Sequence, residues 1–258
     1  MNIFISRLVG AAVVAVALST AIVARAQFTG TAGFDYSTGK YGESSSTDIL
    51  YVPAIARYDM DAWTFKLTVP YIHVSGPGNV IQSIGPIRTR RTITMNQTES
   101  GLGDVIAAAN YDFYTNKTSG LTLGVTGKVK FGTASSSRGL GTGENDYFLQ
   151  LDASRPFGDF TPFGSFGYRV VGNPSGANLK NIFYGSVGSA YKLDQANTVG
   201  ASLDLRQKIS DTGDAAEELT GFVTHKFDQQ WRVQAYALTG FTNASPDIGA
   251  GALVSYSF

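Results

Sequence analysis

The chain contains no cysteine, so it has no disulfide, no cysteine-linked lipid and no cysteine metal site. Its only histidines, His73 and His225, lie far apart and form no spaced set of metal ligands. Basic and acidic side chains number 20 each, so the positive excess needed to bind nucleic acid is missing. We therefore expect no metal, no cofactor and no nucleic-acid partner.

Residues 1–26 are typical of a secretory signal peptide. Arg7 precedes an apolar run from residue 8 to residue 23, and Ala24-Arg25-Ala26 fits the A-x-A cleavage pattern. The run is too short for a comfortable membrane span, and no stop-transfer charge cluster follows it. We expect cleavage before Gln27, export through the inner membrane, and one structural domain over residues 27–258.

No later apolar stretch approaches the ~20 residues that a spanning helix requires. Glycine (30 residues), tyrosine (13) and phenylalanine (16) are instead abundant, which favours turns and strands. Lipid offers no hydrogen-bond partner to an unpaired strand edge, so strands can cross a membrane only as a closed barrel.

Apolar residues alternate with polar ones in repeated segments of about 10 residues, the length of a tilted membrane-crossing strand. In residues 121–131, for example, leucine and valine oppose Lys128 and Lys130; in residues 231–239, Trp231 and Val233 oppose Arg232 and Gln234. The pattern predicts twelve strands and an all-β, antiparallel up-and-down transmembrane barrel. The predicted strands are 28–38, 47–58, 63–74, 102–113, 120–131, 145–155, 160–171, 182–192, 197–208, 217–227, 231–240 and 248–258.

Short connections alternate with longer ones, as in bacterial outer-membrane barrels with short periplasmic turns and long external loops. An even strand number then places both ends of the barrel domain in the periplasm. The expected location is the outer membrane of a Gram-negative envelope, in contact with its lipids and lipopolysaccharide.

The last strand ends on an aromatic residue, Phe258. Such an end resembles the terminal signal of outer-membrane proteins, which the barrel insertion machinery reads. Aromatic residues near the short turns predict a girdle at the periplasmic interface. Its expected members are Tyr58, Trp63, Tyr111, Phe113, Tyr191, Phe227, Trp231, Tyr256 and Phe258. A soluble β-sandwich or lipocalin-like barrel remains an alternative at this point, although it leaves these aromatic positions unexplained.

Charges of both signs fall on the inward face of the predicted strands. Mixed signs predict paired ladders inside a narrow, partly plugged passage. The expected inward charges are Lys66, Asp104, Lys128, Lys130, Arg169, Asp204, Arg206, Lys208, Lys226 and Arg232, with Asp35, Asp112, Asp152 and Glu218.

The longest connection, residues 75–101, combines Arg88, Arg90 and Arg91 with several branched apolar residues. One hypothesis is a gate that folds against the lumen wall or over the mouth, its arginines setting the local charge. An ordinary surface loop that contacts lipopolysaccharide phosphates through the same arginines is equally compatible.

Catalytic signals are weak. Ser75 lies two residues from His73, which makes an outer-membrane lipase- or esterase-like hydrolase the enzymatic alternative. Acidic residues near the outer rim, among them Glu144 and Asp146, are expected to be solvated. The glycine-rich stretch in residues 135–146 has no phosphate-binding ending and is expected to form a flexible outer loop.

Residues 47–74, followed by "SGLGDVIAAANYDF" at 100–113, resemble the outer-membrane family named for the MetA pathway of phenol degradation. The likeness covers mainly the N-terminal half, and its sharpest piece is residues 100–104. Here Gly101 and Gly103 would let a strand start beneath the long loop, with Asp104 turned inward. The resemblance implies no enzyme but a channel for passive uptake of small hydrophobic or aromatic solutes. A structural barrel with a closed lumen is a further alternative.

Overall fold

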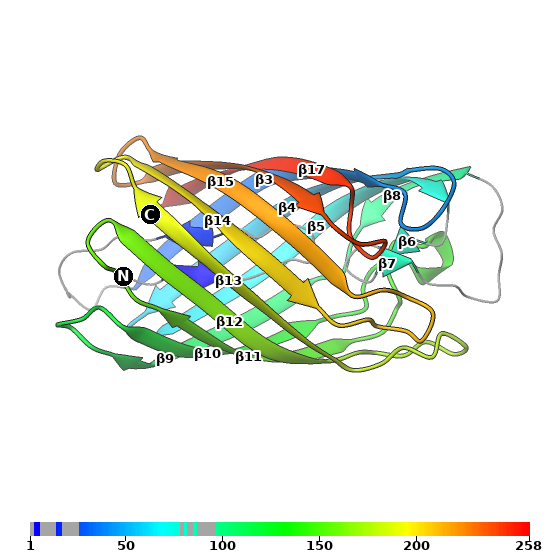
Figure 1. The fold of residues 1–258 in the computed structure, drawn as a ribbon, viewed down its shortest axis with the longest axis horizontal. Helices are drawn as coiled ribbons and strands as arrows, with labels where there is room; N and C mark the ends of the chain where they lie inside the picture. Colours follow the sequence, from blue (N-terminus) through cyan, green and yellow to red (C-terminus); the bar gives the residue numbers. More distant parts are fainter. Residues whose placement is uncertain (1–2, 6–13, 17–25, 78–79, 82–84, 87–95) are drawn as a thin grey trace.

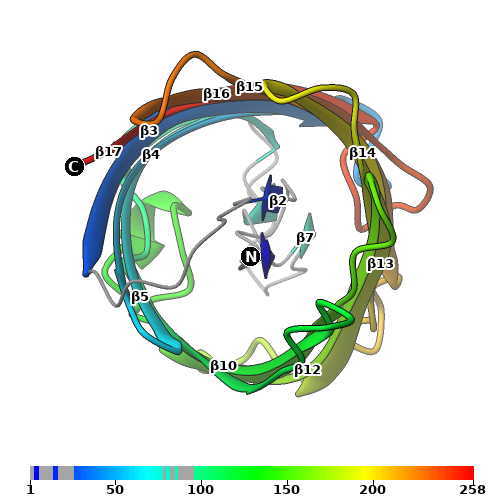
Figure 2. The same ribbon diagram turned by 90° about the vertical axis from the view of Figure 1, so that its left-hand side faces the viewer.

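The computed structural model describes residues 3–5, 14–16, 26–77, 80–81, 85–86 and 96–258. It is a closed, antiparallel barrel of twelve strands (Figures 1 and 2). The barrel strands are β3 (Gln27–Gly39), β4 (Thr47–Met60), β5 (Trp63–Pro77), β8 (Asn96–Leu102) with β9 (Ile106–Thr115), β10 (Thr122–Lys130), β11 (Asp146–Ser154), β12 (Phe160–Val170), β13 (Ile182–Lys192), β14 (Asn197–Arg206), β15 (Ala216–Lys226), β16 (Trp231–Gly240) and β17 (Ile248–Ser257). The sequence-based expectation of twelve strands and their order is confirmed.

The sheet closes because β17 pairs with β3, the first strand of the barrel. Tyr256 lies opposite Gly30, and the register runs on to Ile248 opposite Thr38. A closed sheet has no edge strand, so backbone donors and acceptors are paired within the wall.

The fourth barrel strand consists of two pieces, β8 and β9, which pair with the upper and lower halves of β5. The break falls at Gly103–Val105, where Gly103 donates its N–H to the Pro70 carbonyl at 2.9 Å. A Cβ on Gly103 would lie 2.5 Å from Cδ1 of Ile72, so this close approach requires glycine. The expectation that the strand starts at residue 102 is therefore wrong: the wall already begins at Asn96.

Connections differ in length between the two ends of the barrel. One end carries the short turns, such as residues 61–62 and 227–230, together with the C-terminus; the other carries the long loops, including 131–145 and 171–181 (Figure 1). The loop 131–145 contains the only helix of the described residues, the 3₁₀ turn η1 (Ser136–Arg138). Among the described residues, no helix has the length and hydropathy needed to cross a membrane.

Large apolar side chains cover the outside of the barrel. Strand alternation exposes Phe34, Leu67, Leu149, Phe166 and Val187 on this surface, each by more than a third of its area. A water-soluble monomer rarely exposes so extensive an apolar surface, and this one suits lipid hydrocarbon. The sandwich alternative is wrong, because the strands form one closed sheet and not two stacked sheets.

Four short strands lie apart from the barrel wall. β6 (Val80–Ile81) pairs with β7 (Gly85–Pro86), and both belong to the long connection after β5. In the axial view β7 lies inside the ring of barrel strands, and in the side view it lies at the long-loop end (Figures 1 and 2). β1 (Ile3–Ile5) and β2 (Val14–Val16) fall within the segment expected to be removed on export.

Candidate functional site

The barrel lumen is lined by the polar face of the strands. Alternation turns the lysines of β10 and Asp204 of β14 inward, while their aliphatic neighbours face outward. Lys128, Lys130, Arg169 and Asp204 are each less than one-tenth exposed. Buried charges require partners, and the identity of those partners divides the lumen into zones.

A buried ion-pair network runs along the wall at the long-loop end of the lumen, over neighbouring strands. Lys130 Nζ lies 2.9 Å from Asp104 Oδ2 and 3.4 Å from Asp146 Oδ2. Arg169 Nη2 lies 2.5 Å from Asp146 Oδ2, and the Gly172 N–H donates to Asp146 Oδ1 at 2.8 Å. The network thus joins three strands to the start of the loop after β12. Asp146 is fully buried, so the expectation that it is a solvated rim acid is wrong.

The loop at residues 131–145 folds against the wall beside the break in the fourth strand. Phe131 N–H donates to the Val105 carbonyl, Thr133 Oγ1 donates to the Gly103 carbonyl at 3.1 Å, and Ala134 N–H donates to Asp104. Leu140, in the same loop, is only 3% exposed. The glycine-rich stretch is therefore anchored to the wall at both Ala134 and Leu140, while Ser136, Ser137 and Arg138 between them are exposed. Its flexibility stays a prediction.

Two apolar clusters close around the long-loop end. The first joins wall and loop residues: Tyr41, Ile49, Tyr51, Ile72, Ala134 and Leu140. The second joins the loops after β12 and β14: Val171, Ala177, Leu179, Ile182 and Ile209. Burial raises the pKa of the Tyr41 hydroxyl, so this side chain stays neutral within the first cluster.

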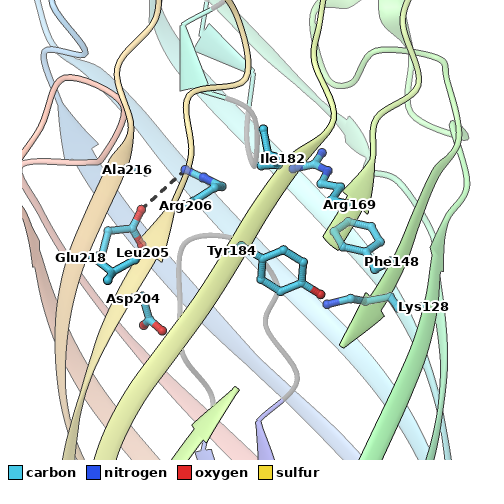
Figure 3. A pocket seen from close by; sticks show the side chains of 10 residues that line it. All are labelled: Lys128, Phe148, Arg169, Ile182, Tyr184, Asp204, Leu205, Arg206, Ala216 and Glu218. Atoms are coloured by element: carbon cyan, nitrogen blue, oxygen red, sulfur yellow. Dashed lines mark ion pairs between the residues drawn. The ribbon is translucent and has the colours of Figure 1, made fainter. Parts of the chain in front are cut away.

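Next to the ion-pair network, in the long-loop half of the lumen, cations combine with aromatic rings in what we call the aromatic pocket (Figure 3). Lys128 Nζ lies 4.6 Å from the Phe148 ring centroid and 5.9 Å from that of Tyr184, and the Arg169 guanidinium lies 5.1 Å from Phe148. Arg206 is 3.9 Å from Glu218. The cavity between these side chains measures about 40 Å³, room for a few water molecules.

A wider cavity of about 560 Å³ opens at the short-turn end. Its charged lining consists of Arg57, Lys226 and Arg232 with Asp59 and Asp228. Arg57 is held by Asp59, with Nε 2.8 Å from Oδ2. We call this cavity the vestibule; in size it falls in the range of small-molecule sites.

The sequence-predicted residues fall in several places. The structure brings together Asp104, Lys130 and Arg169 in the long-loop network, while Lys128, Asp204 and Arg206 line the adjacent aromatic pocket and Arg232 lies in the vestibule. Lys208 was expected to face inward, but β14 ends at Arg206 and Lys208 is exposed in the following loop. Arg88, Arg90 and Arg91 lie outside the described residues.

The expected girdle residues lie on the outer surface near the short turns. Trp63 contacts Tyr111 with ring centroids 4.7 Å apart, and Trp231 contacts Tyr256 at 4.8 Å. Phe258 contacts Tyr256 and Phe28, which joins the chain end to the first barrel strand. The remaining members, Tyr58, Phe113, Tyr191 and Phe227, are each exposed by more than a third. Their role at a membrane interface stays a prediction.

The serine nearest to His73 is Ser100, not Ser75. Ser100 Oγ lies 2.6 Å from His73 Nδ1, whereas Ser75 Oγ pairs with Thr98 Oγ1 at 3.1 Å. Among the described residues, His73 has no hydrogen-bonded carboxylate or amide to orient it, as nucleophilic catalysis needs. These residues also contain no group of three or more potential metal ligands.

Sequence reasoning missed Arg57 and Asp59 in the vestibule and Phe148 and Tyr184 in the aromatic pocket. The alternation of side chains along a strand could have found two of them, since Arg57 shares a face with Asp59 and Phe148 shares one with Asp146 and Asp152. The contact of Phe148 with Lys128 depends on the register between neighbouring strands, which the sequence does not give.

The chain matches no family model and no curated protein. Among solved structures it is similar to a COG4313 outer membrane channel from Pseudomonas putida F1, with 15% identity and a TM-score of 0.69 over 92% of this chain and 97% of that one. The KdgM porin shares 13% identity with a TM-score of 0.53, over 88% of this chain and 99% of that one. The translocator domain of the autotransporter NalP from Neisseria meningitidis shares 12% identity with a TM-score of 0.50, over 90% and 88%.

Identities this low show the fold alone, so the resemblance to the family named for the MetA pathway stays a prediction. The chain has the fold of an outer-membrane β-barrel.

Proposed function

We propose that this protein is an outer-membrane channel for passive movement of small solutes, including hydrophobic or aromatic ones. The observation that carries the proposal is the contrast between the two faces of one closed sheet. The outer face is apolar, as lipid requires, and the inner face combines buried charges, aromatic rings and an open vestibule. A barrel with a purely structural role would not need so many costly inward charges.

The exported form comprises residues 27–258, with the signal peptide removed. Phe258 would be read by the insertion machinery, so deletion of this residue should lower the yield of folded barrel in the outer membrane. Heat-modifiable mobility on gels measures that yield, and a Ser257→Ala variant that keeps the terminal ring is the control.

Conductance in a planar bilayer tests channel function directly. The mature protein should give discrete current steps, and vesicles that contain it should swell in isosmotic solutions of small aromatic solutes. The heat-denatured preparation is the control. A correctly folded barrel that neither conducts nor passes solute would contradict the proposal and favour a structural barrel with a closed lumen.

The loop between β5 and β8 would set the charge at the outer mouth through Arg88, Arg90 and Arg91. Replacing all three by glutamate should shift ion selectivity toward cations, because three positive charges become negative. Unchanged ion selectivity would contradict the gate hypothesis. The three arginines would then be expected to contact lipopolysaccharide phosphates.

A hydrolase is the second candidate, favoured only by the short His73–Ser100 contact. A Ser100→Ala change should then abolish release of fatty acid or ester product, with Ser75→Ala as the matched control. We expect no hydrolysis above background in either variant or in the unmodified protein.

A further inference from the structure

A compact polar patch lies on two neighbouring strands, β15 and β16, and two of its residues, Lys226 and Arg232, line the vestibule. Thr224 lies directly opposite Gln234 in the strand register, and Lys226 lies directly opposite Arg232. All four residues fall on the lumen-facing side of their strands. Directly opposed residues have Cβ atoms about 5 Å apart, so the four polar groups form one continuous surface.

Three polar atoms of this patch are buried without a hydrogen-bond partner in the part of the chain that the structure describes. They are Arg232 Nη1, Gln234 Nε2 and Thr224 Oγ1. Thr224 is only 2% exposed and Gln234 only 5%. Unsatisfied buried donors are rare in native proteins, because each loses its bonds to water and gains nothing in return.

The two cations of the patch also lack an ion-pair partner among the described residues, although Asp59 and Asp228 line the same cavity. Lys226 and Arg232 are like charges in directly opposed positions, which is unfavourable by itself. Neither forms an ion pair with an acid of the described residues. Asp59 acts electrostatically on Arg232, yet its carboxylate is held by Arg57 and by the hydroxyl of Thr64.

We propose that this patch recognises the carboxylate of a small organic acid, and that such acids are the solutes that leave the channel through the vestibule. The inference rests on the proposed channel function and names its substrate class. Two of the three unpartnered atoms can only donate hydrogen bonds, and the third is a hydroxyl that can also donate. A carboxylate in the vestibule satisfies Arg232 Nη1, the unpartnered atom whose residue lines the cavity.

The geometry of the groups favours a carboxylate over a simple halide ion. The arginine guanidinium presents a planar fork of donors that matches the two oxygens of a carboxylate. Lys226 supplies a second positive charge beside it, and Thr224 and Gln234 lie two residues further along the same strands, behind the cavity lining. The cavity of about 560 Å³ leaves room for the organic body of the acid.

Benzoate is a suitable probe because it joins a carboxylate to an apolar ring. In planar bilayers that contain the mature protein, we expect current carried preferentially by anions and reduced reversibly by benzoate. The double variant Lys226→Gln/Arg232→Gln should bind benzoate about tenfold to a hundredfold more weakly, as expected for loss of charge-assisted hydrogen bonds. Lys117→Gln removes the same kind of charge from an exposed turn at the same end of the barrel and is the matched control.

Direct binding makes the test independent of conduction. Calorimetric titration of the detergent-solubilised protein with benzoate, acetate and inorganic phosphate should rank benzoate first, and the double variant should lose this binding while it keeps its heat-modifiable fold. Equal benzoate binding by the double variant and the unmodified protein would overturn the inference, and so would tighter binding of phosphate.

The two proposals fail in different ways. If the unmodified protein conducts without anion preference and its calorimetric affinity for benzoate equals that of the double variant, the protein remains a channel but has no carboxylate site. A protein that binds benzoate through Arg232 but never conducts keeps the site and loses the channel.

Discussion

The two ends of the lumen solve the problem of buried charge differently. At the long-loop end, Lys130 and Arg169 share the carboxylate of Asp146, and two apolar clusters pack around this network. At the short-turn end, Arg57 is paired with Asp59, whereas Lys226 and Arg232 face an open vestibule without an acidic partner among the described residues.

This difference separates structural charge from charge kept available for a ligand. A buried ion pair with full hydrogen bonding holds loops in place but offers little to a passing solute. Unpaired donors cost stability and are retained where a ligand supplies the missing partner. We therefore expect changes at the long-loop end to alter stability and changes at the vestibule to alter binding.

The largest effect is expected from Asp146→Ala. It leaves Lys130 and Arg169 buried without their shared carboxylate, and breaking a buried pair in this way costs about 3–5 kcal/mol. Urea unfolding from lipid vesicles measures the loss. Asp211→Ala, which breaks an exposed pair with Lys180, should leave stability unchanged. Equal losses in both variants would remove the distinction between the two kinds of charge.

A smaller effect is expected from Leu140→Ala. The substitution removes buried packing from the first apolar cluster, at a cost of about 2–4 kcal/mol to the docking of the loop 131–145. The loop should detach more often, so single-channel conductance should rise. Leu149→Ala, on the outer surface, is the control. Unaltered conductance would show that this loop does not obstruct the lumen.

Phe148→Leu tests the aromatic pocket beside the long-loop network. It removes the ring that Lys128 and Arg169 contact, and cation–π contacts contribute about 0.5–2 kcal/mol. Vesicle swelling should show altered passage of aromatic solutes relative to aliphatic ones of equal size. The same change at lipid-facing Phe166 should leave that ratio as it was.

The smallest effect is expected from Trp63→Ala in the outer girdle. Loss of its contact with Tyr111 should lower stability by about 0.5–1.5 kcal/mol, in addition to the effect of the apolar area that the ring buries. The measurement is again urea unfolding from vesicles. Ion selectivity should not change, because the ring faces lipid; a change would mean that outer and inner faces are coupled at this end.

The fold could be predicted almost completely from the chain. Alternation in each segment reports directly which side of a strand meets lipid, since a lysine and an aliphatic side chain cannot share that medium. This is why the twelve strands, their order and the closure of β17 on β3 follow from pattern alone. The break at Gly103–Val105 was missed because it depends on the approach of a distant loop.

The candidate site could be predicted only in part. The alternation of polar and apolar residues identified four inward charges, Lys128, Lys130, Arg169 and Arg232. It could not show which of them form ion pairs. Asp146 resembled a rim acid because its sequence neighbours are polar and glycine-rich. Its burial arises from Arg169 and Lys130 on the two strands that flank it.

The sequence by itself determined the membrane-type barrel, its two faces and the asymmetry of its ends, because these are periodic properties of local segments. Only the tertiary structure decided which loops pack into the lumen, which charges neutralise one another and where donors stay unpartnered. Those outcomes depend on the register between neighbouring strands and on how loops return to the wall, and hydropathy along one strand carries no information about the side chain that lies beside it on the next.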